Sequence, residues 1–213
     1  DQVAFDDGAR KTRVLYDELG REWQTARKAP APQPWIAVDT RYDARGRLDR
    51  VSNPYEESGE IQQSWTTTAY DALDRPSSVT TPDGAVVSTH YAGPETLVVD
   101  AMGRMRRSVT DALGRVVSVT EYPEGATAWE TRYTWDALDH LTSVRQGAQP
   151  PRSFLYDSLG RLREAWNPES GLVRYEHDLS GVLAWRKDAR GVETTYESDA
   201  LGRPRRRSYS DDT

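Results

Sequence analysis

The sequence contains no cysteine and only three histidines among its 213 residues. Without cysteine, the protein cannot depend on disulfides or on Cys-ligated metal sites. No apolar run approaches the ~20 residues that a helix needs to cross a bilayer, and the first residues lack the apolar stretch of a signal peptide. We therefore expect no membrane span, and we expect any export signal to lie outside this segment.

A surplus of basic charge is also missing. The chain has 28 basic and 34 acidic residues, for a net charge of −6, whereas phosphate binding normally requires a positive field. The strongest basic cluster is Arg203-Pro204-Arg205-Arg206-Arg207, and a strand would divide these arginines between its two faces. We expect no nucleic-acid partner.

Recognisable catalytic motifs are absent as well. His90, His140 and His177 are 50 and 37 residues apart, a spacing that is not typical of metal ligands. The sequence has no P-loop, no Gly-x-Ser-x-Gly, no His-Glu-x-x-His and no calcium-binding loop. We therefore nominate no catalytic or metal-binding residue, expect no cofactor, and predict that the protein is not an enzyme.

Aromatic and turn-forming residues, in contrast, are plentiful. The chain has 7 Trp, 11 Tyr, 15 Gly and 12 Pro, although only 36% of its residues are hydrophobic. Aromatic side chains favour a pleated, half-buried surface, and Gly and Pro mark turns. This composition predicts a folded, turn-rich β protein rather than a disordered chain.

A short motif, aromatic-Asp-x-x-Gly-Arg, repeats along the chain. The complete copies contain Tyr16, Asp17, Gly20 and Arg21, then Tyr42, Asp43, Gly46 and Arg47, then Tyr156, Asp157, Gly160 and Arg161. Copies with Asp in place of Gly begin at Tyr70-Asp71 and Trp135-Asp136. Three copies lack the aromatic: the first contains Asp100, Gly103 and Arg104; the second contains Asp111, Gly114 and Arg115; the third contains Asp199, Gly202 and Arg203. Weaker copies begin at Asp178 and Asp188. Successive Asp positions are separated by 10 to 29 residues, which a unit near 21, a half-unit near 11 and loop insertions explain.

Pro-led turns alternate with this motif, as at Thr81-Pro82-Asp83-Gly84 and Asn167-Pro168. Each Pro follows the Gly position of the preceding motif by eight or nine residues, which leaves room for a strand of about six residues, a common strand length. Residues 116–122 alternate between apolar and polar as a half-buried strand does. The pattern predicts tandem antiparallel β-hairpins with little helix.

Each motif position has a mechanical explanation. The Asp can accept a backbone N–H two residues on, and the Gly can adopt the positive φ of a tight hairpin. Asp74 and Asp139 at the Gly position are tolerable because Asp visits the left-handed region more readily than most residues. We expect the aromatic ring to stack on its counterpart in the next hairpin, and the Arg to lie over a ring or to pair with an Asp.

The phased Tyr-Asp-x-x-Gly-Arg motif resembles the YD repeat of Rhs proteins, which are related to wall-associated proteins, the Tc toxin C components and teneurins. The resemblance extends from about Phe5-Asp6 to Arg203. It implies an all-β fold in which hairpin repeats form a curved or spiralling sheet, part of a hollow shell that encloses a C-terminal toxin in the bacterial members. The self-cleaving site of that family contains an Asp-Pro dipeptide, which does not occur here, so this activity is not carried over.

We accordingly expect one repeat array over residues 1–213, with a Pro-rich loop insertion at 24–40, as a fragment of a larger bacterial protein that is secreted or displayed at the cell surface. Its expected partners are a toxin cargo domain and the remaining shell repeats of the same polypeptide. Unpaired edge strands of the isolated fragment would promote homo-oligomers.

The alternative function is cell-surface adhesion or glycan binding through exposed aromatics. This alternative depends on the seven tryptophans, which could stack on sugar faces: Trp23, Trp35, Trp65, Trp129, Trp135, Trp166 and Trp185. Binding to a glycan array, lost when an exposed Trp is replaced, would favour it over containment.

Overall fold

A computed structural model describes residues 2–6, 11–28, 33–58 and 64–211. Every regular element in these ranges is a β-strand, and every pairing between strands within the two units below is antiparallel. The prediction of an all-β fold built from antiparallel hairpins is therefore confirmed. The chain divides into two compact units, Asp1–Tyr91 with Leu97–Met105, and Ala92–Thr96 with Arg106–Thr213.

The first unit is built mainly from the strands that precede residue 92. These are β1 (Gln2–Asp6), β2 (Lys11–Tyr16), β3 (Glu22–Lys28), β4 (Trp35–Tyr42), β5 (Leu48–Ser52), β6 (Tyr55–Glu56), β7 (Trp65–Tyr70), β8 (Pro76–Thr80) and β9 (Val86–Ala92). Strands β1 to β4 pair in chain order. Strand β4 then pairs with β6 near its start and with β5 near its end, and β5, β7, β8 and β9 continue the order.

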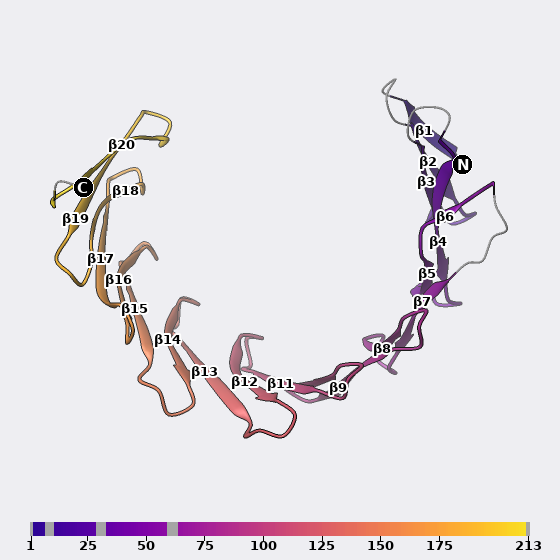
Figure 1. Cartoon of the computed structure of the whole chain (residues 1–213), viewed down its shortest axis with the longest axis horizontal. Helices are drawn as coiled ribbons and strands as arrows, with labels where there is room; N and C mark the ends of the chain where they lie inside the picture. Colours follow the sequence, from indigo (N-terminus) through magenta and orange to yellow (C-terminus); the bar gives the residue numbers. More distant parts are fainter. Residues whose placement is uncertain (1, 7–10, 29–32, 59–63, 212–213) are drawn as a thin grey trace. The chain divides into compact units, whose positions relative to one another are not determined.

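The second unit is a meander in which each strand pairs with the next from β12 onward (Figure 1). Its strands are β12 (Val116–Tyr122), β13 (Trp129–Trp135), β14 (Leu141–Gln146), β15 (Arg152–Tyr156), β16 (Leu162–Asn167), β17 (Gly171–His177), β18 (Leu183–Lys187), β19 (Glu193–Ser198) and β20 (Pro204–Tyr209). Strands β10 (Glu95–Val99) and β11 (Met105–Thr110) each have residues in both units.

Few side chains are fully buried. The buried apolar residues among those described are Ala26, Ala37 and Val119. Most strand residues are instead half-buried, as expected for hairpins that are covered mainly by their neighbours. Stability must therefore come largely from contacts between successive hairpins, and not from a central core.

A β-bulge lies beside the motif turn in hairpins of both units. The pairing register shifts by one residue just before the Asp, so that Leu15 faces Gln24 while Tyr16 faces Glu22, and Trp23 is the extra residue. The same shift occurs between Arg41/Tyr42, Ala69/Tyr70, Thr134/Trp135, Leu155/Tyr156, Glu176/His177 and Glu197/Ser198. A bulge bends its strand and increases the local twist, so these seven hairpins carry a bend at the same place.

The Pro-rich insertion differs from the expected 24–40 range. Strand β3 extends to Lys28 and β4 begins at Trp35, and the two strands pair from Gln24↔Asp39 to Lys28↔Trp35. The connection is therefore the short segment 29–34, of which 29–32 lie outside the described residues. Residues 22–28 and 35–42 form strands instead of a loop because their side chains alternate in burial, with Ala26 and Ala37 buried.

Among the described residues, no helix is both long and apolar enough to span a bilayer.

Candidate functional site

The repeated motif folds into one kind of turn, which we call the Asp–Arg turn. In residues 17–21, the Gly20 N–H donates to the Asp17 carbonyl (3.0 Å) and the Asp17 N–H donates to the Arg21 carbonyl (2.9 Å). The same pair of backbone hydrogen bonds closes the segments 43–47, 71–75, 100–104, 111–115, 136–140, 157–161, 178–182, 188–192 and 199–203. The fourth residue has φ between +63° and +89° in all ten turns, including Asp74 (+63°) and Asp139 (+66°).

The Asp carboxylate organises each turn. In residues 157–161, Asp157 Oδ1 accepts the N–H groups of Leu159 and Arg161, both at 2.9 Å. Its Oδ2 accepts the Arg161 guanidinium through Nε and Nη2, each at 2.7 Å. One side chain therefore satisfies two backbone donors and fixes the following Arg, which is the expected Asx turn with an added ion pair.

These contacts stabilise the ionised carboxylate. The backbone N–H of Arg161, opposed by partial desolvation and helped by the Arg161 side chain, holds the pKa of Asp157 below its ordinary value of 3.8. At Asp111 the Arg115 side chain is the main cause of a pKa that is lowered in the same direction. The carboxylates are therefore charged at neutral pH and act as acceptors, not as acids.

The Arg of one turn lies over the aromatic ring of the next motif. The guanidinium carbon of Arg21 is 4.5 Å from the Tyr42 ring centroid, and that of Arg47 is 4.4 Å from the Tyr70 centroid. His140, which stands at an Arg position, stacks on Tyr156 with centroids 4.7 Å apart. In these three cases the ring meets the side chain at the Arg position of the preceding repeat, and not the aromatic of another motif.

The same aromatic also donates a hydrogen bond to the preceding repeat. The Tyr42 hydroxyl donates to the carbonyl of Glu22 (2.8 Å), the residue that follows Arg21. Equivalent bonds join Tyr70 to Leu48 (2.7 Å), Trp135 Nε1 to Val116 (2.8 Å) and Tyr156 to Leu141 (3.0 Å). The motif thus links Tyr42, Tyr70 and Tyr156 to the previous repeat through a ring contact and a hydrogen bond, and Trp135 through a hydrogen bond.

The Asp residues at the Gly position also contribute to this link. Asp139 accepts Arg115 Nη1 at 2.7 Å, and Arg115 Nη1 donates to the Asp136 carbonyl at 2.9 Å. Asp74 pairs with Arg47 in the same way. The sequence explains Asp74 and Asp139 only as tolerated turn variants. In the structure, each carboxylate also binds the Arg of the preceding turn.

Two further features were not predicted from the sequence. The guanidinium carbon of Arg75 lies 4.1 Å from the Tyr91 ring centroid, and the Tyr91 hydroxyl donates to the Pro76 carbonyl at 3.0 Å, although no Asp follows Tyr91. Its distance of 16 residues from Arg75, equal to that from His140 to Tyr156, is the signal that could have identified it. The turn at Asp188 connects β18 to β19, so it lies on the opposite edge of the second unit from the turns at Asp178 and Asp199.

A polar cluster lies where sequence reasoning expected only a loop. Asp39, which is 2% exposed, accepts hydrogen bonds from Gln24 Nε2 and the Tyr55 hydroxyl, both at 2.9 Å. Its own N–H donates to Ser52 Oγ at 2.8 Å. The members come from β3, β4, β5 and β6, so the cluster fixes the register of these strands.

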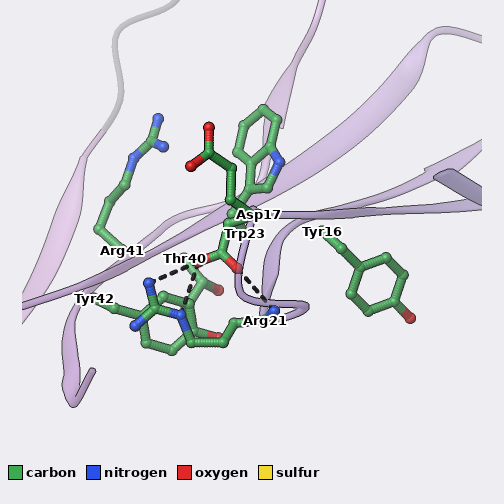
Figure 2. Close-up of a pocket in the computed structure, with 8 residues that line it drawn as sticks. Tyr16, Asp17, Arg21, Trp23, Thr40, Arg41 and Tyr42 are labelled. Carbon is green, nitrogen blue, oxygen red and sulfur yellow. Dashed lines mark hydrogen bonds and ion pairs between the residues drawn. The ribbon is translucent and has the colours of Figure 1, made fainter. Parts of the chain in front are cut away.

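An open cleft of about 420 Å³ lies beside the first Asp–Arg turn (Figure 2). Its lining includes Trp23 and Tyr42, but Arg41 covers the first ring at 5.3 Å and Arg21 covers the second at 4.5 Å. Figure 2 shows Arg21 joined to Asp17 and lying against Tyr42. The Trp23 and Tyr42 rings are therefore already covered by arginine side chains of the protein itself.

Other tryptophans divide into covered and exposed ones. Trp35 and Trp65 lie under Arg13 (5.1 Å) and Arg50 (4.8 Å). Trp129 remains 58% exposed and Trp166 37%.

Within the described part of the chain, no group of three or more His, Cys, Asp or Glu side chains is placed to hold a metal ion. The arrangement supports packing between repeats better than it supports a reaction.

Comparison with known proteins agrees with this repeat geometry. The family model described as RHS Repeat matches residues 111–149, which include two Asp–Arg turns. The chain contains an RHS repeat. This confirms the resemblance to Rhs and YD-repeat proteins inferred from the motif.

Solved structures share the fold of this chain over nearly its whole length. A crystal structure of TcdB2-TccC3 has a TM-score of 0.78 at 19% identity over 98% of this chain, and a Photorhabdus luminescens Tc holotoxin pore has 0.76 at 17% over 98%. A crystal structure of TcdB2-TccC3 without its hypervariable C-terminal region gives 0.77 at 17% over 100%. The chain spans 13% of each of those chains. No curated protein matches the sequence.

Proposed function

We propose that this chain is a wall segment of a bacterial Rhs-type shell that encloses a C-terminal toxin domain. The observation that carries the proposal is the link between successive hairpins, in which Arg21 binds its own Asp17 and lies over Tyr42 of the next repeat, as Arg47 lies over Tyr70. Such links make a wall whose stability depends on neighbouring repeats, and they require no catalytic group.

The similar structures support this role. One of them is described as lacking a hypervariable C-terminal region and another as a holotoxin pore, which is the setting expected of a shell with a variable cargo. The partners of this segment are then the remaining repeats of its polypeptide and the cargo domain. Its site of action is outside the producing cell or at its surface.

The reading frame on both sides of this segment provides the first test. Further repeats followed by an Asp-Pro-x-Gly-type core end and an unrelated C-terminal domain are the expected result. A stop codon directly after Thr213, or a wall anchor with no such domain, would contradict containment.

Limited proteolysis of the whole polypeptide provides the second test. We expect the C-terminal domain to resist cleavage in the intact protein, and to become sensitive when several Asp–Arg turns are broken by Asp→Asn substitutions. A cargo that is cleaved equally fast in both proteins would contradict encapsulation.

Glycan binding is the competing function, and the exposed Trp129 is the observation that favours it. Binding of the chain to a glycan array, abolished in Trp129→Ala and retained in Trp65→Ala, would support it. The Trp65 ring is the matched control because Arg50 already covers it.

A further inference from the structure

One edge of the second unit carries a row of exposed leucines at the tips of its turns. The turns that follow β11, β13, β15, β17 and β19 all lie on this edge, because a meander alternates its connections between two edges. Their tips hold Leu113, Leu138, Leu159, Leu179 and Leu201, which are 71%, 69%, 74%, 108% and 77% exposed. We call this row the leucine edge.

Turn chemistry does not explain these leucines. Arg45 and Arg190 stand at the third position of their own Asp–Arg turns, the position of every leucine in the row except Leu179, which is second in its turn. The backbone hydrogen bonds are the same, so the third position accepts a charged residue. The opposite edge of the second unit has Glu124, Gln149, Glu169 and Arg190 in its turns. A row of exposed leucines on one edge of this unit points to an interaction surface.

The charges beside the leucines are already paired. Arg115, Arg161 and Arg203 each lie 2.7 Å from the Asp of their own turn. Beside the leucines, Ala112, Ala137, Ser158, Ser180 and Ala200 are uncharged, whereas Leu138 is followed by Asp139, which binds Arg115, and Leu179 is preceded by Asp178, which accepts the N–H groups of Ser180 and Val182. The like-charge penalty between two identical edges is therefore limited to these two Asp residues.

The spacing of the row is also specific. Successive turns on one edge are two strands apart, so the leucines recur about every 10 Å. A partner that matches this pitch must itself be a hairpin array, and a second copy of this chain has the same pitch by construction. In a two-fold arrangement, the leucines of one copy would fit between those of the other.

We propose that the leucine edge of the second unit docks on the same edge of a second copy of this chain. Five leucines from each copy would bury about 1,000 Å² in total, near the lower limit for a specific interface. The dimer is therefore expected to be reversible and to have micromolar affinity. This surface lies along the turns, and is distinct from the unpaired edge strands expected at the ends of an array.

The test is light scattering on the 213-residue chain at about 100 µM, well above a micromolar Kd. We expect a dimer for the original sequence and a monomer for the variant L113R/L138R/L159R/L201R, since Arg45 and Arg190 show that these turns accept arginine. Circular dichroism verifies that the variant keeps its strands. A monomeric original sequence, or a variant that stays dimeric, would overturn the proposal.

Oxidative cross-linking gives an independent measurement, because the chain has no native cysteine. Leu159 is in the middle of the row and so closest to the two-fold axis, whereas Arg190 is on the opposite edge. Leu159→Cys should cross-link rapidly between copies, and Arg190→Cys should not. Equal rates for the two variants would count against the leucine edge.

Discussion

Asp17 shows the two tasks of the aspartate in a turn that ends in Arg. Its Oδ1 satisfies two backbone N–H groups, and its Oδ2 positions the guanidinium that contacts the next repeat. Because these acceptors are used in the charged form, the turn depends on ionisation of the carboxyl group. The charge is therefore part of the fold, which gives the repeat a predictable response to acid.

We predict that the protein loses stability steeply in acid. The pKa of Asp111, Asp157 and Asp199 is lowered from 3.8, so the folded protein binds these protons less readily than the unfolded chain does. Their contribution is complete well above the ordinary value of 3.8 and is lost as the pH falls through the lowered values. Urea denaturation should give nearly constant free energies of unfolding from pH 7 to 5 and a fall below pH 4.

The contrary result would be a constant free energy of unfolding between pH 5 and pH 2.5. A matched control is Asp157→Asn, which keeps an acceptor for the backbone N–H groups but has neither the charge nor the titration. It should lower stability at pH 7 and should show a smaller fall in acid than the original sequence.

Local contacts at this level were predictable from the sequence because they span only five residues. The Asx turn and the positive φ of Asp74 and Asp139 follow from side-chain chemistry alone. The burial of Asp39 did not, because its partners Gln24, Ser52 and Tyr55 come from other strands. Nothing near Asp39 in the sequence indicates that pairing would bring them together.

The hairpin is the unit in which a turn substitution has its effect. Gly160 has φ +76°, and a Cβ there would meet His140 Nε2 at 2.6 Å. Gly160→Val should therefore destabilise the protein by about 1 to 2 kcal/mol through left-handed strain, with a further loss if His140 leaves Tyr156. Thermal unfolding measures the change as a decrease in Tm of several degrees.

Gly114→Val separates these two causes. Gly114 has a similar φ of +81°, but a Cβ there meets nothing within 4 Å. It should show the strain alone, so Gly160→Val should have the larger effect of the two. Unchanged Tm in both variants would contradict the turn assignment.

Links between hairpins can be tested at Tyr42. Tyr42→Phe removes the 2.8 Å hydrogen bond to the Glu22 carbonyl but keeps the ring under Arg21, so we expect a loss of about 0.5 kcal/mol. Tyr42→Leu should cost more because the ring contact is lost as well. Tyr16→Phe is the control, since no hydrogen bond of its hydroxyl is found among the described residues, and it should be close to neutral. Equal unfolding free energies for all three variants would refute the link.

The existence of hairpins was predictable from the alternation of two turn types, but the bulges beside seven of the turns were not. The register shift between Leu155 and Tyr156 depends on how β15 pairs with β16, and strand alternation alone would have continued without it. The contact of the motif Arg with a ring was expected, but the motif alone did not specify that the ring belongs to the next repeat. A motif contains residues of a single repeat, whereas Arg21 and Tyr42, which are in contact, belong to two successive repeats.

Across the chain, stability should be a sum of short-range terms. Pairings between strands connect near neighbours in chain order, and the buried apolar residues are few. Such an array resembles a one-dimensional chain of coupled units, in which damage spreads only as far as the coupling between neighbours allows. A globular domain with one core would instead open as a whole.

Hydrogen exchange of Gly160→Val distinguishes these two behaviours. We expect amide exchange to become faster in β15 and β16, which flank the altered turn, and to a smaller degree in β14 and β17, which pair with them. Amides of β2, β3 and β4 in the first unit should exchange at the original rate, because no pairing joins them to the altered hairpin. Equal acceleration in both units would mean that the repeats open cooperatively, and a wall assembled from independently stable hairpins would then be the wrong description.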